Sequence, residues 1–338
     1  MIDLRSDTVT KPSIGMIKAM LSAEIGDDVL GDDVSVKRLE NKAAKLFGRE
    51  AALFCTSGTM TNQIAISTHC IPGEEVICEK TSHVHLYEGG GIAKNALCSV
   101  KTISGKYGLI NKELLQNNIR LKEDIHQPRQ KLVCIENTTN KGGGMYYKKS
   151  DLIDIKKLCS THQLKLHLDG ARLFNAITES NLSTLFFGEI FDSISICLSK
   201  GLGCPIGSLL IGDKNYIDDA RRKRKVMGGG WRQAGYLAEA GIYALNNNID
   251  KLKKDHTHAK RIGNALEKTI FFESILPIKT NIVIAKLKDC YKAKDIVNKF
   301  KNNQILCLDF GDNQIRFVTH LGISEKDLEK FESKIKRL

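Results

Sequence analysis

The sequence has few prolines, few aromatic residues and no cysteine pair at the spacing of a metal or redox motif. Only five prolines and 6% aromatic residues occur among its 338 residues. The ten cysteines contain no C-x-x-C, so a zinc ribbon or a redox dithiol has little support, and we expect free thiols, as in a cytosolic protein. Cys134 and Cys197 lie inside apolar runs and should pack as small hydrophobic residues.

Long apolar stretches and nucleotide-binding motifs are also missing. The apolar stretch 193–212 is broken by a lysine, a proline and glycines, so it does not suit a bilayer span. The first residues alternate between charged and apolar and do not resemble a signal peptide, which predicts a cytoplasmic protein without a membrane partner. Neither G-x-x-x-x-G-K-[ST] nor G-x-G-x-x-G occurs, which argues against a nucleoside triphosphatase or a dehydrogenase.

The charge of the chain is strongly basic. Lysine and arginine outnumber aspartate and glutamate by 51 to 39, which gives a formal net charge of +12. Most lysines stand singly on amphipathic stretches, as on a solvated helix face. Residues 221–225, RRKRK, are the exception and could bind an anion. The low aromatic content and the lack of a recognisable binding motif argue against nucleic acid as a partner.

Alternating strand and helix patterns predict an α/β fold with a mostly parallel central sheet covered on both faces. Helical periodicity occurs over residues 59–70 and 151–163. The ligands of such a sheet bind at the carboxyl ends of its strands. The apolar runs predicted as strands, each ending in polar or glycine residues, are 51–58, 74–80, 131–138, 164–170, 193–201 and 205–212.

The pattern changes after Gly241. One long helical pattern over residues 242–270 precedes short strand-like runs with two further helices interleaved. We therefore expect a large domain over residues 1–245, which includes an N-terminal arm, and a smaller C-terminal α/β domain over residues 246–338. The connecting helix would act as a hinge. The strand-like runs are 280–287, 304–310 and 313–319.

Two polar residues follow neighbouring predicted strands and suggest a cofactor. Lys200 comes directly after the apolar run that begins at residue 193, and Asp169 ends the preceding strand, 31 residues earlier. Taken alone, Lys200 would be a surface lysine in a turn and Asp169 a helix N-cap. Together they would place an amine and a carboxylate at one edge of the sheet. A pyridoxal ring requires this pair, an amine for its aldehyde and an anion for its ring nitrogen.

A phosphate site is predicted where residues 56–59, TSGT, follow a strand and open a helix. Backbone amides, hydroxyl groups and the positive end of the helix dipole would converge there. Simple helix capping explains such a sequence in most proteins. Its position at a strand–helix junction ahead of Asp169 and Lys200 favours the phosphate interpretation.

Other candidate residues lie in loops and on a late strand. His83 and His85 precede three glycines, and His83 could stack on a cofactor or move protons. Their spacing also suits a metal, but no third ligand is evident, so we expect none. Tyr87 and Glu88 could shape the same pocket. Arg316 alternates with apolar neighbours on its strand and could either bind a carboxylate through two hydrogen bonds or be an outward charge.

Eight segments of the chain, in order, resemble the low-specificity L-threonine aldolases, a family of the pyridoxal-phosphate fold-type-I (aspartate aminotransferase-like) superfamily. They are RSDTVTKPS, GDDVLGDD, SGTMTNQIA, SHVHLYEGGG, ENTTNKGGG, LHLDGARLFNA, CLSKGLGCPIGS and GGGWRQAGYLAEAGIYAL. The spacing of LHLDGAR and LSKGLG is the most specific part of this likeness. The resemblance implies pyridoxal 5′-phosphate as the cofactor.

The resemblance also implies roles for individual residues. By this likeness Lys200 binds the cofactor covalently and Asp169 faces its pyridine nitrogen. Gly58 and Thr59 would hold the phosphate, His83 would stack on the ring, and Arg172 would lie near the phenolic oxygen. Ser6 and Arg316 match positions that bind the substrate carboxylate.

Further positions match residues near the substrate or a neighbouring subunit. His126, in EDIHQPR, resembles a histidine that reaches the substrate in some members, and Tyr87 resembles a pocket aromatic. Arg232 and Lys225 match basic residues that approach the cofactor of a neighbouring subunit, because family members are homotetramers whose active sites are shared across a dimer interface. Trp231 departs from the family pattern, in which methionine is expected, and alters the packing beside Arg232.

The activity implied by the resemblance is retro-aldol cleavage of L-threonine or L-allo-threonine, and of related β-hydroxy-α-amino acids, to glycine and an aldehyde. Such an enzyme would serve threonine catabolism and glycine biosynthesis. The base that takes the hydroxyl proton could be His83, His126 or a water molecule that they position. β-Elimination or transamination on the same scaffold is the alternative reading.

Overall fold

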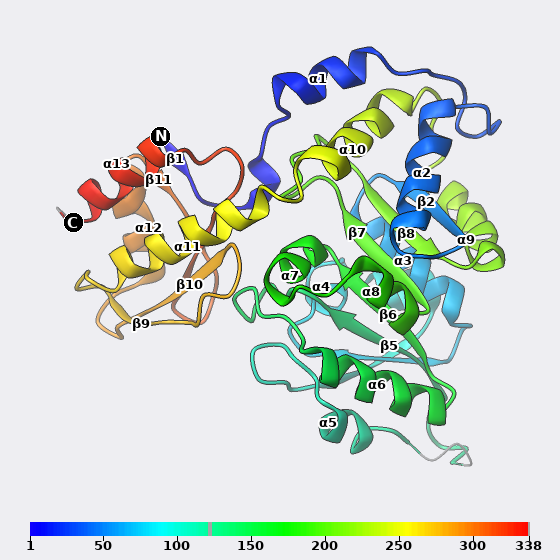
Figure 1. The fold of residues 1–338 in the computed structure, drawn as a ribbon. Coiled ribbons are helices and arrows are strands. Elements are labelled where there is room, and N and C mark those ends of the chain that lie inside the picture. The colour runs from blue at the N-terminus through cyan, green and yellow to red at the C-terminus, as the bar shows by residue number, and fades with distance from the viewer. Residues whose placement is uncertain (121–123, 337–338) are drawn as a thin grey trace.

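The computed structural model describes residues 1–120 and 124–336 and shows two α/β domains of unequal size (Figure 1). The large domain is built on a seven-stranded sheet in the order β2-β8-β7-β6-β5-β3-β4. Only β8 runs antiparallel to its neighbours, so the prediction of a mostly parallel sheet is confirmed. The strands are β2 (Ala51–Cys55), β3 (Glu75–Glu79), β4 (Ser99–Ile103), β5 (Gln130–Glu136), β6 (Lys165–Gly170), β7 (Ser193–Cys197) and β8 (Ser208–Gly212).

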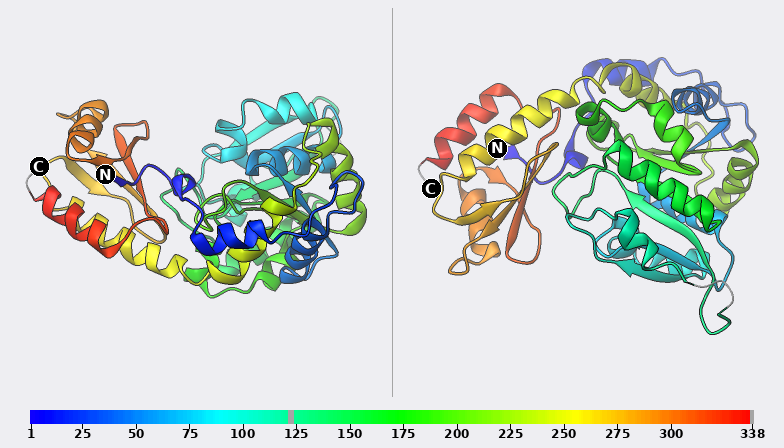
Figure 2. Two further views of the ribbon diagram at one scale, coloured as in Figure 1. Left: turned by 90° about the horizontal axis from the view of Figure 1, so that it is seen from above. Right: turned by 60° about the horizontal axis from the view of Figure 1, so that its bottom comes forward.

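Helices cover both faces of this sheet, as its apolar strands require (Figure 2). On one face α3 and α9 pack, and on the other lie α2, α6, α7, α8 and α10. The helices are α2 (Val34–Leu46), α3 (Gly58–His69), α6 (Lys149–Thr161), α7 (Leu173–Ser180), α8 (Thr184–Ile190), α9 (Lys214–Val226) and α10 (Gly235–Asn247), with the short α4 (His83–Leu86), α5 (Lys112–Gln116) and a π-helical turn at Ile92–Ala96.

The small domain has a four-stranded antiparallel sheet in the order β12-β13-β10-β9, with a core of its own. Its strands are β9 (Phe272–Ile275), β10 (Ile282–Leu287), β12 (Leu308–Asp309) and β13 (Gln314–Val318), and its helices are α11 (Leu252–Leu266), α12 (Ala293–Asn302) and α13 (Glu325–Ile335).

The start of the chain belongs to the small domain, which differs from the predicted division at residue 245. Strand β1 (Ile2–Asp3) pairs in parallel with β11 (Ile305–Leu306), and the side chains of Ile2 and Leu4 are buried in the small-domain core. The arm then crosses to the large domain through a 3-10 turn (Asp7–Val9) and α1 (Ile14–Leu21). The burial of these two apolar side chains stabilises the position of the first residues in the small domain, although the rest of that domain lies far away in the sequence.

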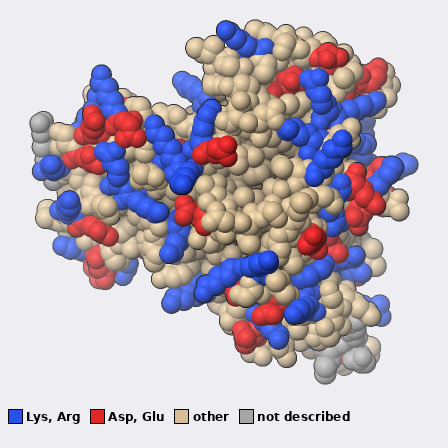
Figure 3. Space-filling view, viewed as in Figure 1, with Lys and Arg blue, Asp and Glu red and all other residues tan. Residues whose placement is uncertain are grey.

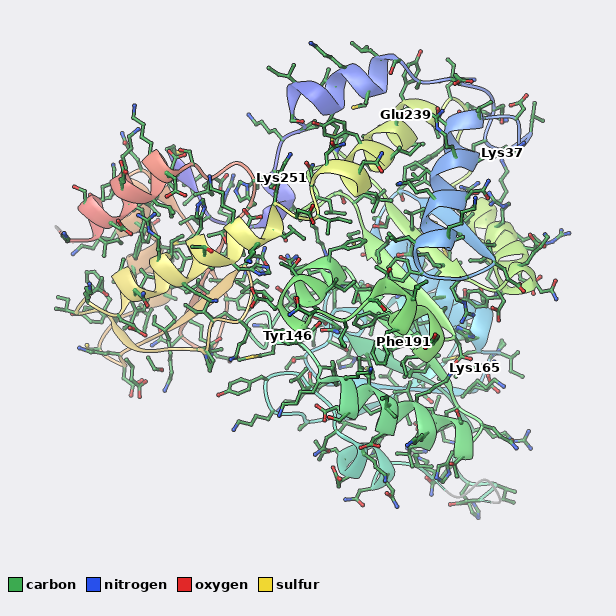
Figure 4. All side chains as sticks on the ribbon, viewed as in Figure 1. Lys37, Tyr146, Lys165, Phe191, Glu239 and Lys251 are labelled. Carbon is green, nitrogen blue, oxygen red and sulfur yellow. The ribbon has the colours of Figure 1, made fainter. Side chains whose placement is uncertain are left out.

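The prediction of one long helix over residues 242–270 is wrong, because the structure has two helices there, α10 and α11. The break follows three consecutive asparagines, a residue type whose side chain competes with the helical backbone for hydrogen bonds. Nδ2 of Asn248 donates instead to the carbonyl oxygen of Leu202, 2.8 Å away in the large domain. Lys251, directly before α11, marks the junction (Figure 4).

The charged side chains on the visible surface are of mixed sign and form no single basic stripe (Figure 3). In the described part of the chain, no helix combines the length and apolar character that a bilayer crossing needs. Nine of the ten cysteines are buried without a disulfide. Cys134 packs in an apolar cluster as predicted, whereas the buried sulfur of Cys197 accepts a hydrogen bond from Oγ of Ser208 at 3.2 Å.

Candidate active site

The sheet brings Asp169 and Lys200 to the same edge. β6 and β7 are parallel neighbours, with Asp169 opposite Ser195, and Lys200 follows three residues after the end of β7. Lys165, at the amino end of β6, lies on the side away from the small domain (Figure 4). The carboxyl ends of these strands therefore face the small domain. The charge of Lys200 also acts on His83, as the charge of Asp169 does. An amine and a carboxylate therefore share one rim.

Asp169 does not cap the following helix. α7 begins at Leu173 with Arg172 in the N-cap position. The carboxylate of Asp169 is buried and accepts hydrogen bonds from the backbone N–H of Ala171, at 3.2 Å, and from Nδ2 of Asn62, at 3.0 Å. The capping interpretation is excluded, and the carboxylate is held in place by neighbours that keep it an acceptor.

The predicted phosphate segment forms the N-terminus of α3. Gly58 and Thr59 are the first residues of this twelve-residue helix, and the hydroxyl oxygen of Ser57 caps it by accepting from the N–H of Met60 at 3.2 Å. The remaining free N–H groups and the helix dipole give this end a positive potential. Because α3 follows β2 directly, its N-terminus lies at the carboxyl edge of the sheet.

His83 lies at the start of α4 beside a buried carboxylate. Its Nδ1 is 2.9 Å from Oε1 of Glu88, and its ring is tilted against that of Tyr87, with 5.6 Å between ring centres. Burial lowers the pKa of His83, but the hydrogen bond to Glu88 and the charge of Asp169 outweigh it, so the pKa is raised overall. Tyr87 is 45% exposed and lies beside His83, on the solvent side of the site.

Arg172 makes a buried, bidentate ion pair with Asp7. Its Nε and Nη2 atoms both lie 2.7 Å from the carboxylate oxygens of Asp7. Asp7 also interacts electrostatically with Lys200 and Arg316. Ser6, the N-cap of the 3-10 turn, accepts from the N–H of Thr8. The arm therefore brings Ser6 and Asp7 into the same neighbourhood as the sheet edge.

Arg316 points from β13 toward the large domain, whereas its neighbours Ile315 and Phe317 are buried in the small-domain core. Its Nη1 donates to Oδ1 of Asn140 at 2.8 Å, and its Nη2 donates to the carbonyl oxygen of Arg5 at 3.1 Å. Its Nε is buried without a partner. Burial, together with the like charge of Arg172, lowers the pKa of Arg316 to about 10. The outward-charge interpretation is therefore excluded.

The structure does not bring His126 or Arg232 to these residues within one chain. His126 is exposed in the turn before β5, at the amino edge of the sheet and so at the opposite end of the strands from Asp169. His126 therefore lies away from the rim of its own chain, because the parallel strands separate the two edges. The side chain of Arg232 is 61% exposed and pairs with Asp27 at 2.9 Å.

The basic run 221–225 lies in α9 and is partly structural. The guanidinium group of Arg224 is buried, donating to Asp28 and to the carbonyl oxygen of Phe54, each at 2.6 Å. Arg221 pairs with Glu40 at 2.8 Å. The run is therefore not a free anion-binding stripe. Trp231, nearby, packs edge-on against Phe54.

Several residues that sequence reasoning missed complete the rim. Glu136 ends β5 beside Asp169, and its carboxylate accepts from the backbone N–H of His83 at 2.6 Å. Burial and the charge of Asp169 raise the pKa of Glu136 to about 7. Asn137 is buried with both side-chain polar atoms unpartnered. The position of Glu136 at the end of an apolar strand was a usable signal, but nothing local marked Asn137 as unpaired.

A pyridoxal phosphate group fits the residues present. The amine and the carboxylate that its ring requires share one rim, and the N-terminus of a long helix lies at the same edge for its phosphate. The buried polar atoms of Asn137 and the Nε of Arg316 have no partner within the described residues, as expected at the wall of a ligand site.

A group of potential metal ligands also lies at this site. Within residues 1–120 and 124–336, His83, Glu88 and Asp169 are the group of side chains close enough to share an ion. In the described structure they make hydrogen bonds, His83 with Glu88 and both carboxylates with Asn62.

Comparison with known proteins identifies the family of this chain. The model of the β-eliminating lyase family matches residues 3–290. A probable low-specificity L-threonine aldolase 2 of Arabidopsis thaliana is 38% identical over 97% of this chain and 94% of its own length. The low specificity L-threonine aldolase of Escherichia coli (strain K12) is 39% identical over 97% of this chain and 96% of its own length.

A solved threonine aldolase structure from Leishmania major has the same fold, with a TM-score of 0.84 at 24% identity over 100% of this chain and 99% of that one. The fold and the rim of Asp169 and Lys200 define a lyase of the kind that the family model describes. The chain belongs to the β-eliminating lyase family and, within it, groups with the low-specificity L-threonine aldolases.

The buried pair of Asp7 and Arg172 predicts a specific loss of stability in acid. Burial raises the pKa of Asp7, but the charge of Arg172 outweighs it and lowers the pKa from 3.8 to about 2. A carboxylate whose pKa is lower in the folded chain than in the unfolded chain adds to the free energy of unfolding above about pH 4. For Asp7 this contribution is roughly 2 kcal/mol, and it is lost as the pH falls toward 2.

Asp7→Asn should therefore be less stable at pH 7 by at least about 2 kcal/mol, because Arg172 keeps a buried charge without a partner. Urea unfolding of the protein without cofactor, between pH 7 and pH 3, measures both effects. The variant should lose less of its stability than the wild type over the acidic part of this range. An equal loss in both proteins contradicts the assignment.

Proposed function

We propose that this protein is a pyridoxal-phosphate-dependent aldolase that cleaves L-threonine or L-allo-threonine, and related β-hydroxy-α-amino acids, to glycine and an aldehyde, which is acetaldehyde for threonine. The observation that carries the proposal is the common rim of Asp169 and Lys200 in a chain whose full-length relatives are named low-specificity L-threonine aldolases. The reaction would serve threonine breakdown and glycine formation in the cytoplasm.

Residues of the large domain would hold the cofactor. When bound, pyridoxal phosphate supplies an electron sink for the bond that breaks at the substrate α-carbon. Lys200 offers its amine to the aldehyde, and Asp169 offers an anion to the ring nitrogen. Gly58 and Thr59 would present the N-terminus of α3 to the phosphate, and His83 and Arg172 would contact the ring and its phenolic oxygen.

Residues at the domain junction would bind the substrate. Arg316 presents a planar guanidinium group, which holds a carboxylate through two hydrogen bonds, and Ser6 adds a hydroxyl group. Holding the carboxylate would fix how the substituents of the α-carbon are oriented in the site, and thus which bond can break. Nδ1 of His83 is hydrogen-bonded to Glu88. The other ring nitrogen of His83, Nε2, is then left to accept the proton of the substrate β-hydroxyl group, directly or through water.

An assay of products distinguishes this function from its alternative. The family model also describes β-elimination, which would release ammonia and a keto acid rather than an intact amino acid. With cofactor and L-threonine, we expect glycine and acetaldehyde in equal amounts, with little ammonia. Ammonia as the main product, or pyruvate from serine, would replace the aldolase by an eliminating lyase, and keto acid with aminated cofactor would indicate transamination.

Arg316→Ala should raise KM for threonine by about tenfold or more, because a charged hydrogen-bonded pair to the carboxylate is lost. Its effect on kcat should be smaller. The matched control is Arg261→Ala, which removes a surface arginine of the same domain that pairs with Glu332, and should leave KM unchanged. An unchanged KM in Arg316→Ala would place the carboxylate elsewhere.

We also propose a homo-oligomer, a tetramer with active sites shared across a dimer interface. The N-terminal arm (residues 1–21) and the loop after it (residues 22–33) expose several large apolar side chains. They include Ile14, Leu21 and Leu30. Such a stretch suits a second copy. His126, Arg232 and Lys225, which lie apart from their own site, would then act on that of a neighbour.

Light scattering of the purified protein measures this assembly. The mass should be four times that of one chain, and Leu21→Asp together with Leu30→Asp should lower it. A wild-type monomer with full activity would contradict the shared sites.

A further inference from the structure

A chain of polar side chains runs behind Asp169, and no step of the proposed function uses it. It links His69 at the end of α3, Ser193 at the start of β7, His167 on β6 and Asn62 on α3. Nε2 of His69 lies 2.7 Å from Oγ of Ser193, which lies 2.8 Å from Nδ1 of His167. Nε2 of His167 lies 3.1 Å from Oδ1 of Asn62. These contacts connect the interior of the large domain to the site.

The chain ends on two carboxylates. Nδ2 of Asn62 lies 2.9 Å from Oε1 of Glu88 and 3.0 Å from Oδ2 of Asp169, and all three side chains are buried. Ionised carboxylates only accept hydrogen bonds. They therefore fix the amide of Asn62 with its NH2 group toward them and its oxygen toward His167.

This orientation fixes the proton on each histidine. Burial lowers the pKa of His167 to about 4 and that of His69 to about 3, so both rings are neutral at pH 7. The oxygen of Asn62 accepts, so the proton of His167 is on Nε2 and its Nδ1 accepts from the hydroxyl group of Ser193. The hydroxyl oxygen in turn accepts from Nε2–H of His69. Every donor in the chain thus points toward the carboxylates.

We propose that this chain is a positioning device for the ring-facing carboxylate, in which Asn62 holds Asp169 beside Glu88 and His167 fixes the orientation of Asn62. Two buried carboxylates side by side repel each other. A shared amide donor, backed by a chain of aligned hydrogen bonds, offsets the repulsion and holds the carboxylate of Asp169 in place. The inference rests on the proposed function, because the placement of Asp169 matters to the chemistry when it faces a pyridine nitrogen.

The first test needs no cofactor. In the full-length protein with 15N-labelled histidines, prepared without pyridoxal phosphate, His167 and His69 should be neutral with the proton on Nε2 at pH 7. They should stay so down to about pH 5, well above the pKa of either ring. The signals are assigned by their loss in His167→Gln and His69→Gln. A proton on Nδ1 of His167, or an imidazolium ring at pH 7, would overturn the proposed direction of the chain.

The second test measures what the chain does for the cofactor. Asn62→Leu keeps the branched shape and the number of heavy atoms of the side chain and removes its hydrogen bonds. The dissociation constant for pyridoxal phosphate should rise, and kcat should fall, by about tenfold or more, with KM for threonine changed by less than about threefold. His167→Leu should act in the same direction. Their control is His258→Leu, which removes a buried histidine bonded to Glu325 in the small domain and should change neither quantity.

The outcomes separate the two claims. Wild-type cofactor affinity and kcat in Asn62→Leu would overturn the positioning role. An equal loss in His258→Leu would also overturn it, because general destabilisation would then explain the effect. A wild-type protein that binds no pyridoxal phosphate would overturn the proposed function, whereas the histidine tautomers would still report on the chain itself.

Discussion

Lys200→Ala should lose threonine cleavage by at least about a thousandfold and lose the visible absorbance of bound pyridoxal phosphate, because no other amine replaces the covalent attachment. In the described structure Lys200 follows β7 at the rim that holds Asp169, and its charge reaches both Asp7 and His83. The absorbance spectrum of the purified variant and a coupled assay for acetaldehyde measure the two losses.

The matched control is Lys214→Ala. Lys214 is an exposed lysine at the start of α9 that pairs with Asp218 and lies outside the site. This variant should keep its absorbance and its activity. Activity at the wild-type level in Lys200→Ala would refute the role of the lysine, whatever the spectrum shows.

Asp169→Asn should lower kcat by about a hundredfold or more while it leaves the cofactor attached. The substitution keeps the shape of the side chain and removes the charge that would stabilise a protonated ring nitrogen. Asn62 would then face one carboxylate, Glu88, in place of two. The retained visible absorbance, with kcat and KM from initial rates, separates this effect from a failure to bind the cofactor.

A carboxylate at the other edge of the sheet provides the comparison. Asp192 precedes β7, pairs with Lys156 and Lys165, and accepts from the backbone N–H of Leu166. Asp192→Asn should lower stability and leave kcat unchanged, because it lies at the amino ends of the strands. Equal falls in kcat for the two variants would show that Asp169 acts through folding alone.

Much of the fold could be predicted because buried strands are continuous apolar runs. Six runs predicted the six strands β2, β3, β5, β6, β7 and β8. Strand β4, SVKTI, was missed because it lies at the edge of the sheet and has polar residues. The break between α10 and α11 was missed because it depends on a contact of Asn248 with Leu202, 46 residues away.

The candidate site could be predicted where its residues end strands or begin helices. Asp169 lies near the end of β6 and Gly58 begins α3, and Lys200 follows the end of β7 by three residues, all of which is visible in the sequence pattern. Asp7 could not be predicted as the partner of Arg172, because 165 residues separate them and their contact depends on the crossing of the arm. Asn62 likewise looks like an ordinary helical residue until the fold places it between two carboxylates.

His126 shows the limit of transferring a residue by sequence likeness. Its segment matches the family, yet the parallel sheet places it at the amino edge, away from the rim of its own chain. Sequence likeness carries no information on whether a residue acts on its own site or on that of a neighbour. The described geometry gives this side chain no contact with the rim of its own chain, and its role at a neighbouring site remains part of the proposal.

The most direct measurement is the site of covalent attachment. Purified protein incubated with pyridoxal phosphate is reduced with borohydride, digested and analysed by mass spectrometry. We expect one modified peptide, with the pyridoxyl group on Lys200, and much less of this modification when borohydride is added while excess threonine is present, because the substrate amine then competes with Lys200 for the aldehyde. Labelling of a different lysine, or of none, would contradict the account of this site.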